Sequence, residues 1–354
     1  MKILHVCLTR EFAGSEQYCA TLAAAQAEAG HDVRVLIRGG RDEARINRWR
    51  KTTGGALTLA IAWWVPFRWI RRQVGFRLLR DFGPDVIHSH LGRANLRVAK
   101  RKKQVPGLVW VSSVHLRWKP KEMMDADGLV CVAGWQKPDI EQSGYKGKLR
   151  VIWNWLPPQA PASADAVRAI RDRLNCSDRT VVIGSVGRLH GQKGMDVLIR
   201  AFRSAFDHGE DVRLLIVGEG DERPRLEGLA GSDRRIVFAG YQEQLSPWYE
   251  AMDVYVSAAR YEPFGLTILE AMAHGCRLVC TRTEGPSEFL QDSDRRGLVH
   301  WAERGQAESI AAAMLAAVAK GRARVTHDMA PFAISRAVRE MDTFYEEVKA
   351  AART

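Results

Sequence analysis

The architecture of this chain is most readable in one segment, Arg260-Tyr261-Glu262-Pro263-Phe264-Gly265-Leu266-Thr267-Ile268-Leu269-Glu270-Ala271-Met272-Ala273-His274-Gly275. It follows a short apolar run, Val254 to Ala259, which is typical of a buried strand. The part from Leu266 to Ala273 is rich in helix formers and ends before Gly275. A strand that turns into a helix here would present the N–H groups of Phe264, Gly265 and Leu266 above the strand end. Such a helix N-terminus favours an anion.

Two glutamates bracket this predicted anion site. Glu262 precedes the first helical turn, where it can accept hydrogen bonds from hydroxyl groups. Glu270 lies about 12 Å further along the helix axis, from the standard rise per residue. Hydroxyl acceptors on both sides of an anion site fit a ligand with a sugar at each end of a phosphate group, as in a nucleotide sugar. The alternative is an ordinary surface turn with solvated glutamates, because short motifs also occur by chance.

Apolar runs of strand length alternate with helical patterns along the whole chain. We expect strands at Ile3–Leu8, Val33–Ile37, Val86–His90, Leu108–Val114, Leu129–Val132, Val151–Trp153, Val181–Val186, Leu214–Val217, Ile236–Phe238, Val254–Ala258 and Arg277–Cys280. Strands separated by helices indicate parallel sheets covered on both faces. The chain is therefore predicted to be an α/β protein with two Rossmann-like, doubly wound domains.

The Pro- and Ala-rich segment Leu156 to Ala162 is the natural linker between the two domains. We expect the domains at residues 1–157 and 158–332, with a last helix around 333–354 that could return to the first domain. A ligand is expected in the cleft that the domains face, outside the carboxyl ends of the strands.

The composition is that of a globular protein, with 354 residues of which 46% are hydrophobic and 27% are charged. The segment Lys2 to Leu8 reads as a first strand and lacks the features of a secretory signal. The longest apolar segment, Ala56 to Phe67, is too short to span a bilayer. The six cysteines contain no Cys-x-x-Cys pair. These features predict a cytoplasmic protein with reduced thiols.

The net charge of +12 resides in the first half of the chain. Within it, Ala44 to Arg80 contains no acidic residue and mixes tryptophans with arginines, which suits an anionic lipid interface. We therefore expect contact with the inner face of the membrane through this segment. A basic surface helix with buried tryptophans, or a nucleic-acid patch, would have the same composition.

A second strand-to-helix loop carries two cations. Arg188 follows a predicted strand and Lys193 precedes the next helix. Such a pair could hold a diphosphate and stabilise the charge that develops as it leaves. A solvated basic loop is the alternative. Gly218-Glu219-Gly220 follows another strand and is weaker evidence for a phosphate loop, because glycines often end strands.

Taken together, these motifs resemble the retaining glycosyltransferases of family 4, which have the GT-B fold. The resemblance covers nearly the whole chain. It rests on Gly187-Arg188, Lys193-Gly194, Val217–Gly220, Ala251–Ser257 and Glu262 to Glu270, with Gly30–Val33 similar to the opening unit and Val151–Trp155 similar to the interdomain strand of the family.

The resemblance implies that Arg188 and Lys193 bind the donor diphosphate, that Glu270 binds the ribose and that Glu262 binds hydroxyls of the transferred sugar. His115 matches the family histidine near the reacting carbon, although a buried histidine at a strand end would look the same. The remaining expected donor-binding positions are Gly14, Asn154, Gly187, Gly218, Phe264, Gly265 and Leu266.

Two loops depart from the family pattern, because Phe12–Glu16 has a single glycine and Glu284–Glu288 replaces a commoner double glycine. No metal cofactor is expected. His88 and His90 would share one face of a strand, but no third ligand is apparent in the sequence, which leaves them as structural or acceptor-side residues. The Asp-x-Asp sequences at Asp125–Asp127 and Asp292–Asp294 are expected to be solvated turns.

The resemblance implies retaining transfer of a hexose or related sugar from a nucleoside-diphosphate sugar to an anionic or lipid-linked glycan. Lipopolysaccharide core, polysaccharide or glycolipid biosynthesis at the inner membrane face would suit such an acceptor. Two alternatives remain: a GT-B sugar-nucleotide epimerase, which turns over the donor alone, and a nucleic-acid-binding protein, whose affinity would depend steeply on salt. Nucleic acid is not an expected partner.

Overall fold

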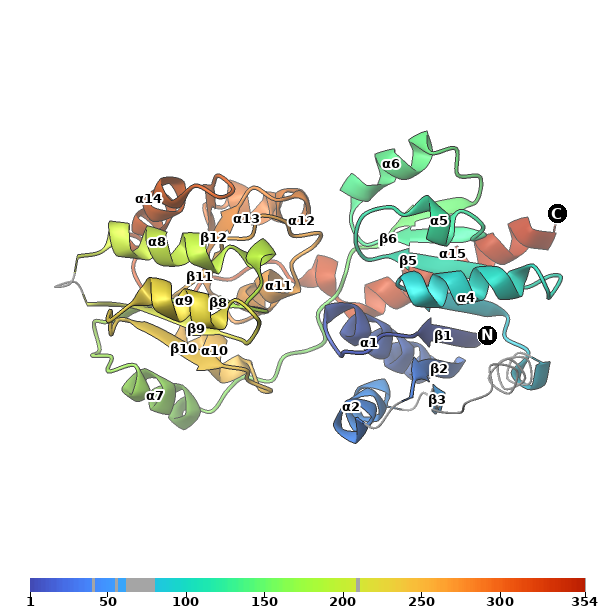
Figure 1. The fold of residues 1–354 in the computed structure, drawn as a ribbon, viewed down its shortest axis with the longest axis horizontal. Helices are drawn as coiled ribbons and strands as arrows, with labels where there is room; N and C mark the ends of the chain where they lie inside the picture. The colour runs from blue at the N-terminus through green and yellow to red at the C-terminus, as the bar shows by residue number, and fades with distance from the viewer. Residues whose placement is uncertain (40–41, 55–56, 62–79, 208–210, 354) are drawn as a thin grey trace. The chain divides into compact units, whose positions relative to one another are not determined.

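The computed structural model describes residues 1–354 apart from 40–41, 55–56, 62–79, 208–210 and 354. The chain forms two compact units, which Figure 1 shows in ribbon form. Unit 1 comprises Met1–Pro157 and Phe332–Thr354, and unit 2 comprises Pro158–Pro331. Each is built on a parallel sheet with helices on both faces, so the predicted α/β class is confirmed. Within the described ranges, no helix is long and apolar enough to cross a membrane.

Unit 1 contains a seven-stranded parallel sheet in the order β3-β2-β1-β4-β5-β6-β7. Its strands are β1 (Lys2–Cys7), β2 (Asp32–Arg38), β3 (Leu57–Ile61), β4 (Val86–His90), β5 (Trp110–Val114), β6 (Gly128–Cys131) and β7 (Lys148–Val151). The strand order reverses between β1 and β4. In open parallel sheets this is the point at which the carboxyl ends of the strands leave a crevice for a ligand.

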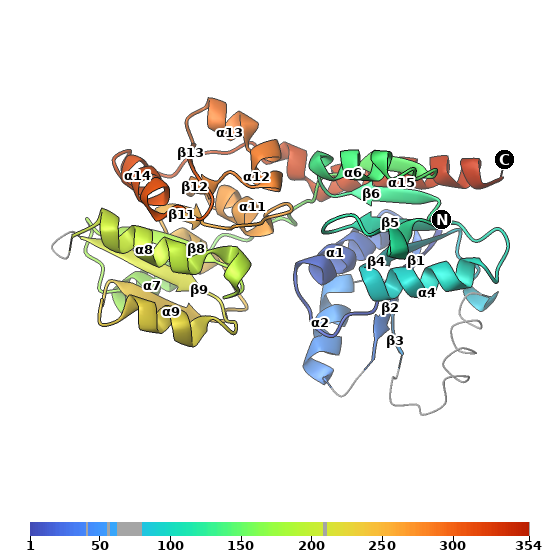
Figure 2. The same ribbon diagram turned by 45° about the horizontal axis from the view of Figure 1, so that its top comes forward.

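The helices of unit 1 bury both faces of this sheet. They are α1 (Gly14–Glu28), α2 (Glu43–Thr53), α4 (Gly92–Lys102), α5 (Pro120–Met123), α6 (Lys137–Gln142) and α15 (Ile334–Arg353). Successive residues of β1 point to opposite faces, so Ile3 joins a core with α1 and α15 while Leu4 joins a second core beneath α4. In both Figure 1 and Figure 2 α15 runs along the sheet of unit 1. The end of the chain is therefore part of the first core.

Unit 2 contains a six-stranded parallel sheet in the order β10-β9-β8-β11-β12-β13. Its strands are β8 (Val181–Val186), β9 (Val212–Val217), β10 (Ile236–Gly240), β11 (Val254–Ser257), β12 (Arg277–Thr281) and β13 (Val299–Ala302). Its α-helices are α7 (Ala164–Arg173), α8 (Met195–Ala205), α9 (Arg223–Ala230), α10 (Ser246–Ala251), α11 (Leu266–Ala273), α12 (Glu284–Phe289), α13 (Gln291–Arg295) and α14 (Ala307–Val318). Here the order reverses between β8 and β11, and the loops after these two strands carry the motifs quoted above.

Several local predictions were wrong. The strands β3 and β13, at the sheet edges, were missed. The residues of β3 lie within the apolar segment Ala56 to Phe67, which was weighed only as a membrane span, and β13 has only four residues. The strand expected at Val151–Trp153 is β7, which ends at Val151. Glu284–Glu288, expected as a loop, belongs to α12, and Asp292–Asp294, expected as a turn, belongs to α13. In both cases a polar sequence without apolar periodicity forms a short helix.

The predicted membrane-contact segment, Ala44 to Arg80, is described only in part. Its first residues belong to α2, where Trp49 is buried in the core of unit 1. The other tryptophans of the segment, together with half of its arginines, lie within 62–79, outside the described residues. Membrane contact therefore stays a prediction.

Candidate active site

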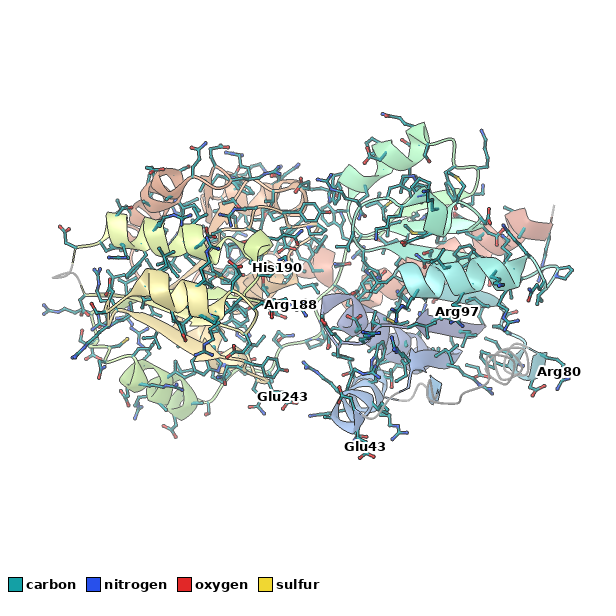
Figure 3. All side chains as sticks on the ribbon, viewed as in Figure 1. Glu43, Arg80, Arg97, Arg188, His190 and Glu243 are labelled. Carbon is teal, nitrogen blue, oxygen red and sulfur yellow. The ribbon has the colours of Figure 1, made fainter. Side chains whose placement is uncertain are left out.

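The loop after β8 brings a cation to the end of the unit 2 sheet. Arg188 and His190 are exposed and follow the strand (Figure 3). Lys193 ends a single 3-10 turn, Gly191–Lys193, and Gly194 follows it with a φ of +66°. A Cβ on Gly194 would lie 2.0 Å from the carbonyl oxygen of Ala258, just after β11. Only glycine therefore allows the Lys193 loop to pack this closely against the next loop of the site.

Lys193 and Glu262 form an ion pair although 69 residues separate them. Lys193 Nζ donates to Glu262 Oε2 at 2.5 Å. The glutamate is buried, with 7% of its surface exposed, whereas the lysine side chain remains 31% exposed. The structure thus brings two of the predicted site residues into direct contact. A buried carboxylate is tolerated here because a charged partner reaches it.

Arg260 joins the same two loops a few residues away. Its guanidinium donates to both carboxylate oxygens of Asp196, at 2.7 and 2.9 Å, and to the carbonyl of Gly191 at 2.8 Å. Its backbone N–H donates to the carbonyl of Gln192 at 2.8 Å. The hydrogen bonds from Arg260 hold the pKa of Asp196 well below its ordinary range. This pair fixes the loop that carries Lys193 to the loop that carries Glu262.

Arg260 and Asp196 were not predicted as site residues. Both lie in segments that the sequence analysis quoted, but neither residue type alone indicates which of many charges it meets. The signal that could have found them is positional. Asp196 falls in the first turn of α8, directly after the Lys193 loop, and Arg260 lies two residues before Glu262.

The predicted helix N-terminus is present, and α11 begins at Leu266 as expected. Gly265 is its N-cap with a φ of +113°, a conformation that L side chains rarely adopt. Phe264 is buried and its ring stacks on that of Phe289, with centroids 4.8 Å apart. Phe264 is therefore anchored by its side chain, and only its backbone is placed to meet a ligand.

The segment after β12 supports this turn from behind. Gly285 N–H donates to the carbonyl of Glu262 at 3.1 Å. A Cβ on Gly285 would lie 2.4 Å from Cα of Phe264. The departure from the family pattern at Glu284–Glu288 thus keeps a glycine where α12 meets the Pro263–Phe264 backbone.

Glu270 is held in a largely apolar environment. Tyr249 Oη donates to Glu270 Oε2 at 2.7 Å. Burial raises the pKa of Glu270 to about 7, and the hydrogen bond from Tyr249 opposes that rise. A carboxyl group in this state gains from further hydroxyl donors, because they stabilise its ionised form.

The loops after β8 and β9 run together through two glycines. Gly218 has a φ of +137°, and a Cβ there would lie 2.0 Å from the carbonyl oxygen of Gly187. Gly187 N–H donates to the carbonyl of Val217 at 3.0 Å. Both glycines serve close backbone approach beside Arg188.

Three predicted site residues belong to unit 1. His115 follows β5 and its Nε2 is 3.2 Å from Nδ1 of His90. Gly14 is the exposed first residue of α1. Asn154 is buried beyond β7, and its Oδ1 has no hydrogen-bond partner in the described part of the chain. Arg188, Lys193, Glu262 and the α11 turn thus gather in unit 2, whereas these three residues do not.

A cavity of about 450 Å³ opens in unit 1 at the carboxyl ends of β1 and β4, the switch point of that sheet. Its polar lining consists of Thr9, Arg10, Glu11, Ser15, Glu16, His90 and Arg93. Arg38 lies close to Arg10 and Arg93. Burial is the larger cause of the lowered pKa of Arg38, and the charges of Arg10 and Arg93 lower it further. The cavity is therefore rich in guanidinium groups that a ligand could reach.

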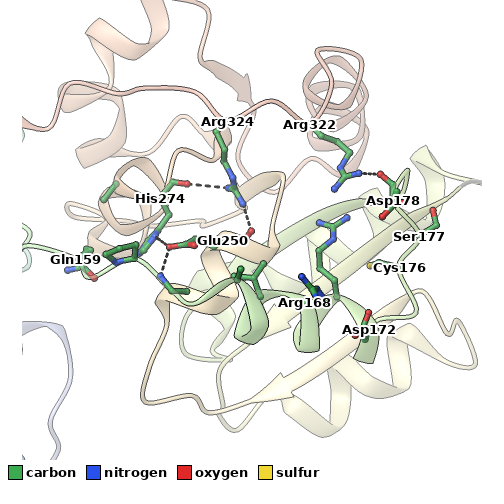
Figure 4. A pocket seen from close by; sticks show the side chains of 16 residues that line it. Gln159, Arg168, Asp172, Cys176, Ser177, Asp178, Glu250, His274, Arg322 and Arg324 are labelled. Carbon is green, nitrogen blue, oxygen red and sulfur yellow. Dashed lines mark hydrogen bonds and ion pairs between the residues drawn. The ribbon is translucent and has the colours of Figure 1, made fainter.

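A second cavity, of about 740 Å³, lies in unit 2 near the amino ends of β8, β11 and β12 (Figure 4). Three of its four arginines bond to backbone carbonyls of the unit, and the fourth, Arg168, is exposed. Arg171 donates to the carbonyls of Ala251 and Thr180, Arg322 to that of Asp178, and Arg324 to that of Glu250. None of the predicted site residues lines this cavity.

The Asp-x-Asp sequences are engaged in structural contacts. Asp127 accepts from the backbone N–H of Trp110 at 2.8 Å and pairs with Lys102, and Asp292 pairs with Arg295. The sequence showed no third metal ligand beside His88 and His90, and the structure adds potential partners for His90 but, among the residues it describes, not for His88. Within the described ranges, His5, Cys19 and His90 place potential ligand atoms within 4.8 Å of one another. The ring nitrogens of His5 and His90 are, however, already hydrogen-bonded.

Two doubly wound units, one of which presents a lysine–glutamate pair beside a helix N-terminus, define a glycosyltransferase of the GT-B class. Two family models match the chain: Glycosyltransferase Family 4 over residues 12–160 and Glycosyl transferases group 1 over residues 180–320. The chain belongs to glycosyltransferase family 4.

Curated relatives carry transferase names. The lipopolysaccharide core biosynthesis glycosyltransferase LpsE of Rhizobium meliloti (strain 1021) is 28% identical over 331 residues, which is 92% of this chain and 91% of LpsE. The D-inositol 3-phosphate glycosyltransferase of Corynebacterium jeikeium (strain K411) is 37% identical over 251 residues, which is 65% of this chain and 58% of that protein. The protein is accordingly a transferase that moves sugars.

Solved structures confirm the fold. Anabaena Alr3699/HepE in complex with UDP and glucose matches with a TM-score of 0.78 at 17% identity, covering 98% of this chain and all of that one. WaaG, described as a glycosyltransferase involved in lipopolysaccharide biosynthesis, matches with a TM-score of 0.65 at 16% identity, covering 99% of this chain and 98% of WaaG. At these identities the likeness concerns the fold alone.

Proposed function

We propose that this protein transfers a hexose or related sugar, with retention of configuration, from a nucleoside-diphosphate sugar to a hydroxyl of an anionic glycan in lipopolysaccharide core biosynthesis. The observation that carries the proposal is the Lys193–Glu262 ion pair beside the N-terminus of α11. The names of LpsE and of a second Rhizobium meliloti relative, LpsD, support the choice of pathway.

The donor is assigned to unit 2. Lys193 and Arg188 bind the diphosphate together with the first N–H groups of α11, because two cations and a helix N-terminus stabilise the same negative charge. Glu262 accepts hydrogen bonds from the transferred sugar through its oxygens, one of which Lys193 holds in place. Glu270 accepts the ribose hydroxyls. We assign these roles from the family motifs in which the four residues lie.

In the reaction, the bond between the anomeric carbon and the diphosphate oxygen breaks, and the electron pair leaves with the diphosphate. The acceptor hydroxyl oxygen attacks the same face of the oxocarbenium-like centre. Its proton passes to an oxygen of the departing phosphate group, so no side chain acts as the base. Lys193 and Arg188 stabilise the leaving group in this scheme, and no metal ion is required.

The acceptor is assigned to the cavity of unit 1. Arg10 and Arg93 line it, and Arg38 lies nearby. Guanidinium groups bind phosphate and carboxylate in a forked geometry, so an anionic glycan fits this lining better than a neutral one. The positive charge of the first half of the chain favours the same acceptor and a membrane surface that carries it.

The first experiment measures transfer with Arg188→Ala and Lys193→Ala, using Lys320→Ala as the matched control because Lys320 is exposed at the end of α14. Loss of a group that stabilises the leaving charge is expected to lower kcat by about 10²- to 10³-fold. The melting temperature should change little in Arg188→Ala and fall in Lys193→Ala, because the second substitution removes the lysine that pairs with the buried carboxylate of Glu262. Near-normal rates in both variants would refute the assignment. A product with inverted anomeric configuration would refute retention, and complete loss of activity in a chelator would refute the metal-free scheme.

A sugar-nucleotide epimerase is the rival activity. An epimerase would turn over the nucleotide sugar in the absence of any acceptor and yield a second nucleotide sugar. A panel of nucleoside diphosphates in a thermal-shift assay identifies the donor base first, because a ligand that binds only the folded state raises its melting temperature.

A further inference from the structure

Three histidines on neighbouring strands face one side of the unit 1 sheet. His5 on β1 pairs in register with His88 on β4, and His90 lies two residues further along β4 on the same face. All three are fully buried beneath the helices of that face. His115 follows β5 and lies beside His90. The other buried side chains that β1, β4 and β5 place on that face are apolar except Ser113, whose Oγ lies 2.7 Å from Nε2 of His88.

Hydrogen bonds connect three of these rings in a row. Gln26 Oε1 lies 2.8 Å from Nε2 of His5, Nδ1 of His5 lies 3.1 Å from Nε2 of His90, and Nδ1 of His90 lies 3.2 Å from Nε2 of His115. Every ring nitrogen of His5 and His90 is used. The row starts at an amide on α1 and ends at the histidine that the family resemblance places near the reacting carbon.

Burial keeps the rings of this row neutral. It lowers the pKa of His5 to about 4 and that of His115 to about 3, and it lowers the pKa of His90 well below its ordinary value. A neutral imidazole has one N–H and one acceptor nitrogen. A row of neutral imidazoles therefore has a direction, and the group at one end sets the tautomer of every ring.

We propose that His90 is a positioning residue which, with His5 and Gln26, holds His115 as the tautomer protonated on Nε2. The Gln26 carbonyl oxygen only accepts, so His5 donates to it from Nε2 and accepts at Nδ1 from His90. His90 in turn accepts at Nδ1 from His115. The lone pair of His115 then lies on Nδ1, the nitrogen for which the described part of the chain provides no partner.

This tautomer suits the proposed function, on which the role of His115 rests. An unprotonated Nδ1 accepts a hydrogen bond from a hydroxyl of the donor sugar. A neutral ring also places no positive charge beside a centre that becomes cationic as the diphosphate leaves. The reverse tautomer would present an N–H to the sugar, and an imidazolium would repel the developing charge.

A metal ion on His5, Cys19 and His90 is the competing use of the same atoms. Their ligand atoms lie within 4.8 Å of one another, and His and Cys are ligands that zinc prefers. Metal binding would replace the hydrogen bond between His5 and His90. The two arrangements therefore exclude each other, and a measurement of bound metal separates them.

The test compares two substitutions of His90 that affect packing and hydrogen bonding in opposite ways. His90→Asn keeps an acceptor near the position of Nδ1 but leaves a void, whereas His90→Phe fills the space without an acceptor. If the hydrogen-bonded row sets the tautomer of His115, kcat is expected to fall by about tenfold in His90→Phe, which corresponds to about 1.4 kcal/mol. In His90→Asn kcat is expected to be largely retained. KM for the donor is expected to change less than kcat. A higher kcat in His90→Phe than in His90→Asn would overturn the positioning role of His90, because packing alone would then explain the effect.

The tautomer itself is measured by ¹⁵N NMR of the full-length chain labelled at histidine, with His115→Gln to assign the resonances. The protonated and unprotonated ring nitrogens have separate shifts, so the expected result is an unprotonated Nδ1 and a protonated Nε2 at His115. The opposite assignment, or one equivalent of bound zinc that is lost in Cys19→Ser, would overturn the proposal. This measurement needs no substrate, so it is decided even if the protein fails to transfer a sugar and the proposed function is wrong.

Discussion

Replacing Glu270 by glutamine is expected to stabilise unit 2 at pH 8 but not at pH 4.5. Burial raises the pKa of Glu270 from an ordinary 4.5 to about 7. Between pH 4.5 and pH 7, Glu270 therefore keeps its proton in the folded state and releases it in the unfolded state. Stability therefore falls as the pH rises through that window. Glutamine carries no charge to bury and still accepts the hydrogen bond that Tyr249 donates at 2.7 Å.

The size of the effect follows from the two pKa values. Their difference corresponds to about 3 kcal/mol of unfolding free energy once the pH exceeds both of them. This figure is an upper value, because Glu270 keeps some exposure to solvent. For a unit of this size, each kcal/mol moves the melting temperature by about 2 to 4 °C. Glu270→Gln is thus expected to melt several degrees above the unaltered protein at pH 8 and together with it at pH 4.5.

The assay is thermal unfolding followed by circular dichroism across this pH range, with Glu243→Gln as the control. Glu243 is an exposed glutamate in the same unit (Figure 3), so its replacement should leave the pH dependence unchanged. A stability difference that is the same at both pH values, or a less stable variant at pH 8, would refute the reasoning. If Glu270 also binds the ribose, Glu270→Gln will weaken nucleotide binding, and the unaltered protein will release protons when it binds nucleotide near pH 6.

Three further outcomes are expected. Gly218→Ala should lower the melting temperature and abolish nucleotide binding, because its Cβ would lie 2.0 Å from the Gly187 carbonyl oxygen. Gly228→Ala, with open space around it in α9, should instead raise the free energy of unfolding by about 0.5 to 1 kcal/mol. Arg260→Lys should lower both stability and donor affinity, because lysine cannot replace the forked contact with Asp196. The stability difference between Arg260→Lys and the unaltered protein should shrink as the pH falls below 3.8, the ordinary pKa of Asp196. The ion pair lowers the pKa of Asp196 in the folded state, so it stops stabilising that state once the carboxylate is protonated. Equal unfolding free energies for Gly218→Ala and Gly228→Ala, or an acid-independent difference for Arg260→Lys, would contradict these expectations.

The α/β class could be predicted from the sequence because strands buried on both faces read as continuous apolar runs. The start and end of α11 were also readable, since Gly265 and Gly275 mark its boundaries in the chain itself. The missed strands β3 and β13 lie at sheet edges, where only one neighbour pairs with them. Pairing at an edge depends on the rest of the sheet, which local sequence does not contain.

The site shows the same division. The sequence separately indicated Lys193 and Glu262 as binding residues, but the ion pair between them depends on how β8 and β11 lie side by side. Arg260 and Asp196 were missed for the same reason. The row from Gln26 to His115 requires the register of β1, β4 and β5, and no motif encodes that register.

The position of α15 in unit 1 bears on how the chain folds as it is made. Domains generally fold as units during synthesis, beginning with the N-terminal one. Here Met341, Phe344 and Tyr345 complete the core of unit 1, yet the ribosome adds them only after the whole of unit 2. Unit 2 is therefore the first to have all of its residues. Until α15 emerges, α1 and α2 alone cover this face of the N-terminal sheet, and the apolar surface that Met341, Phe344 and Tyr345 bury stays exposed.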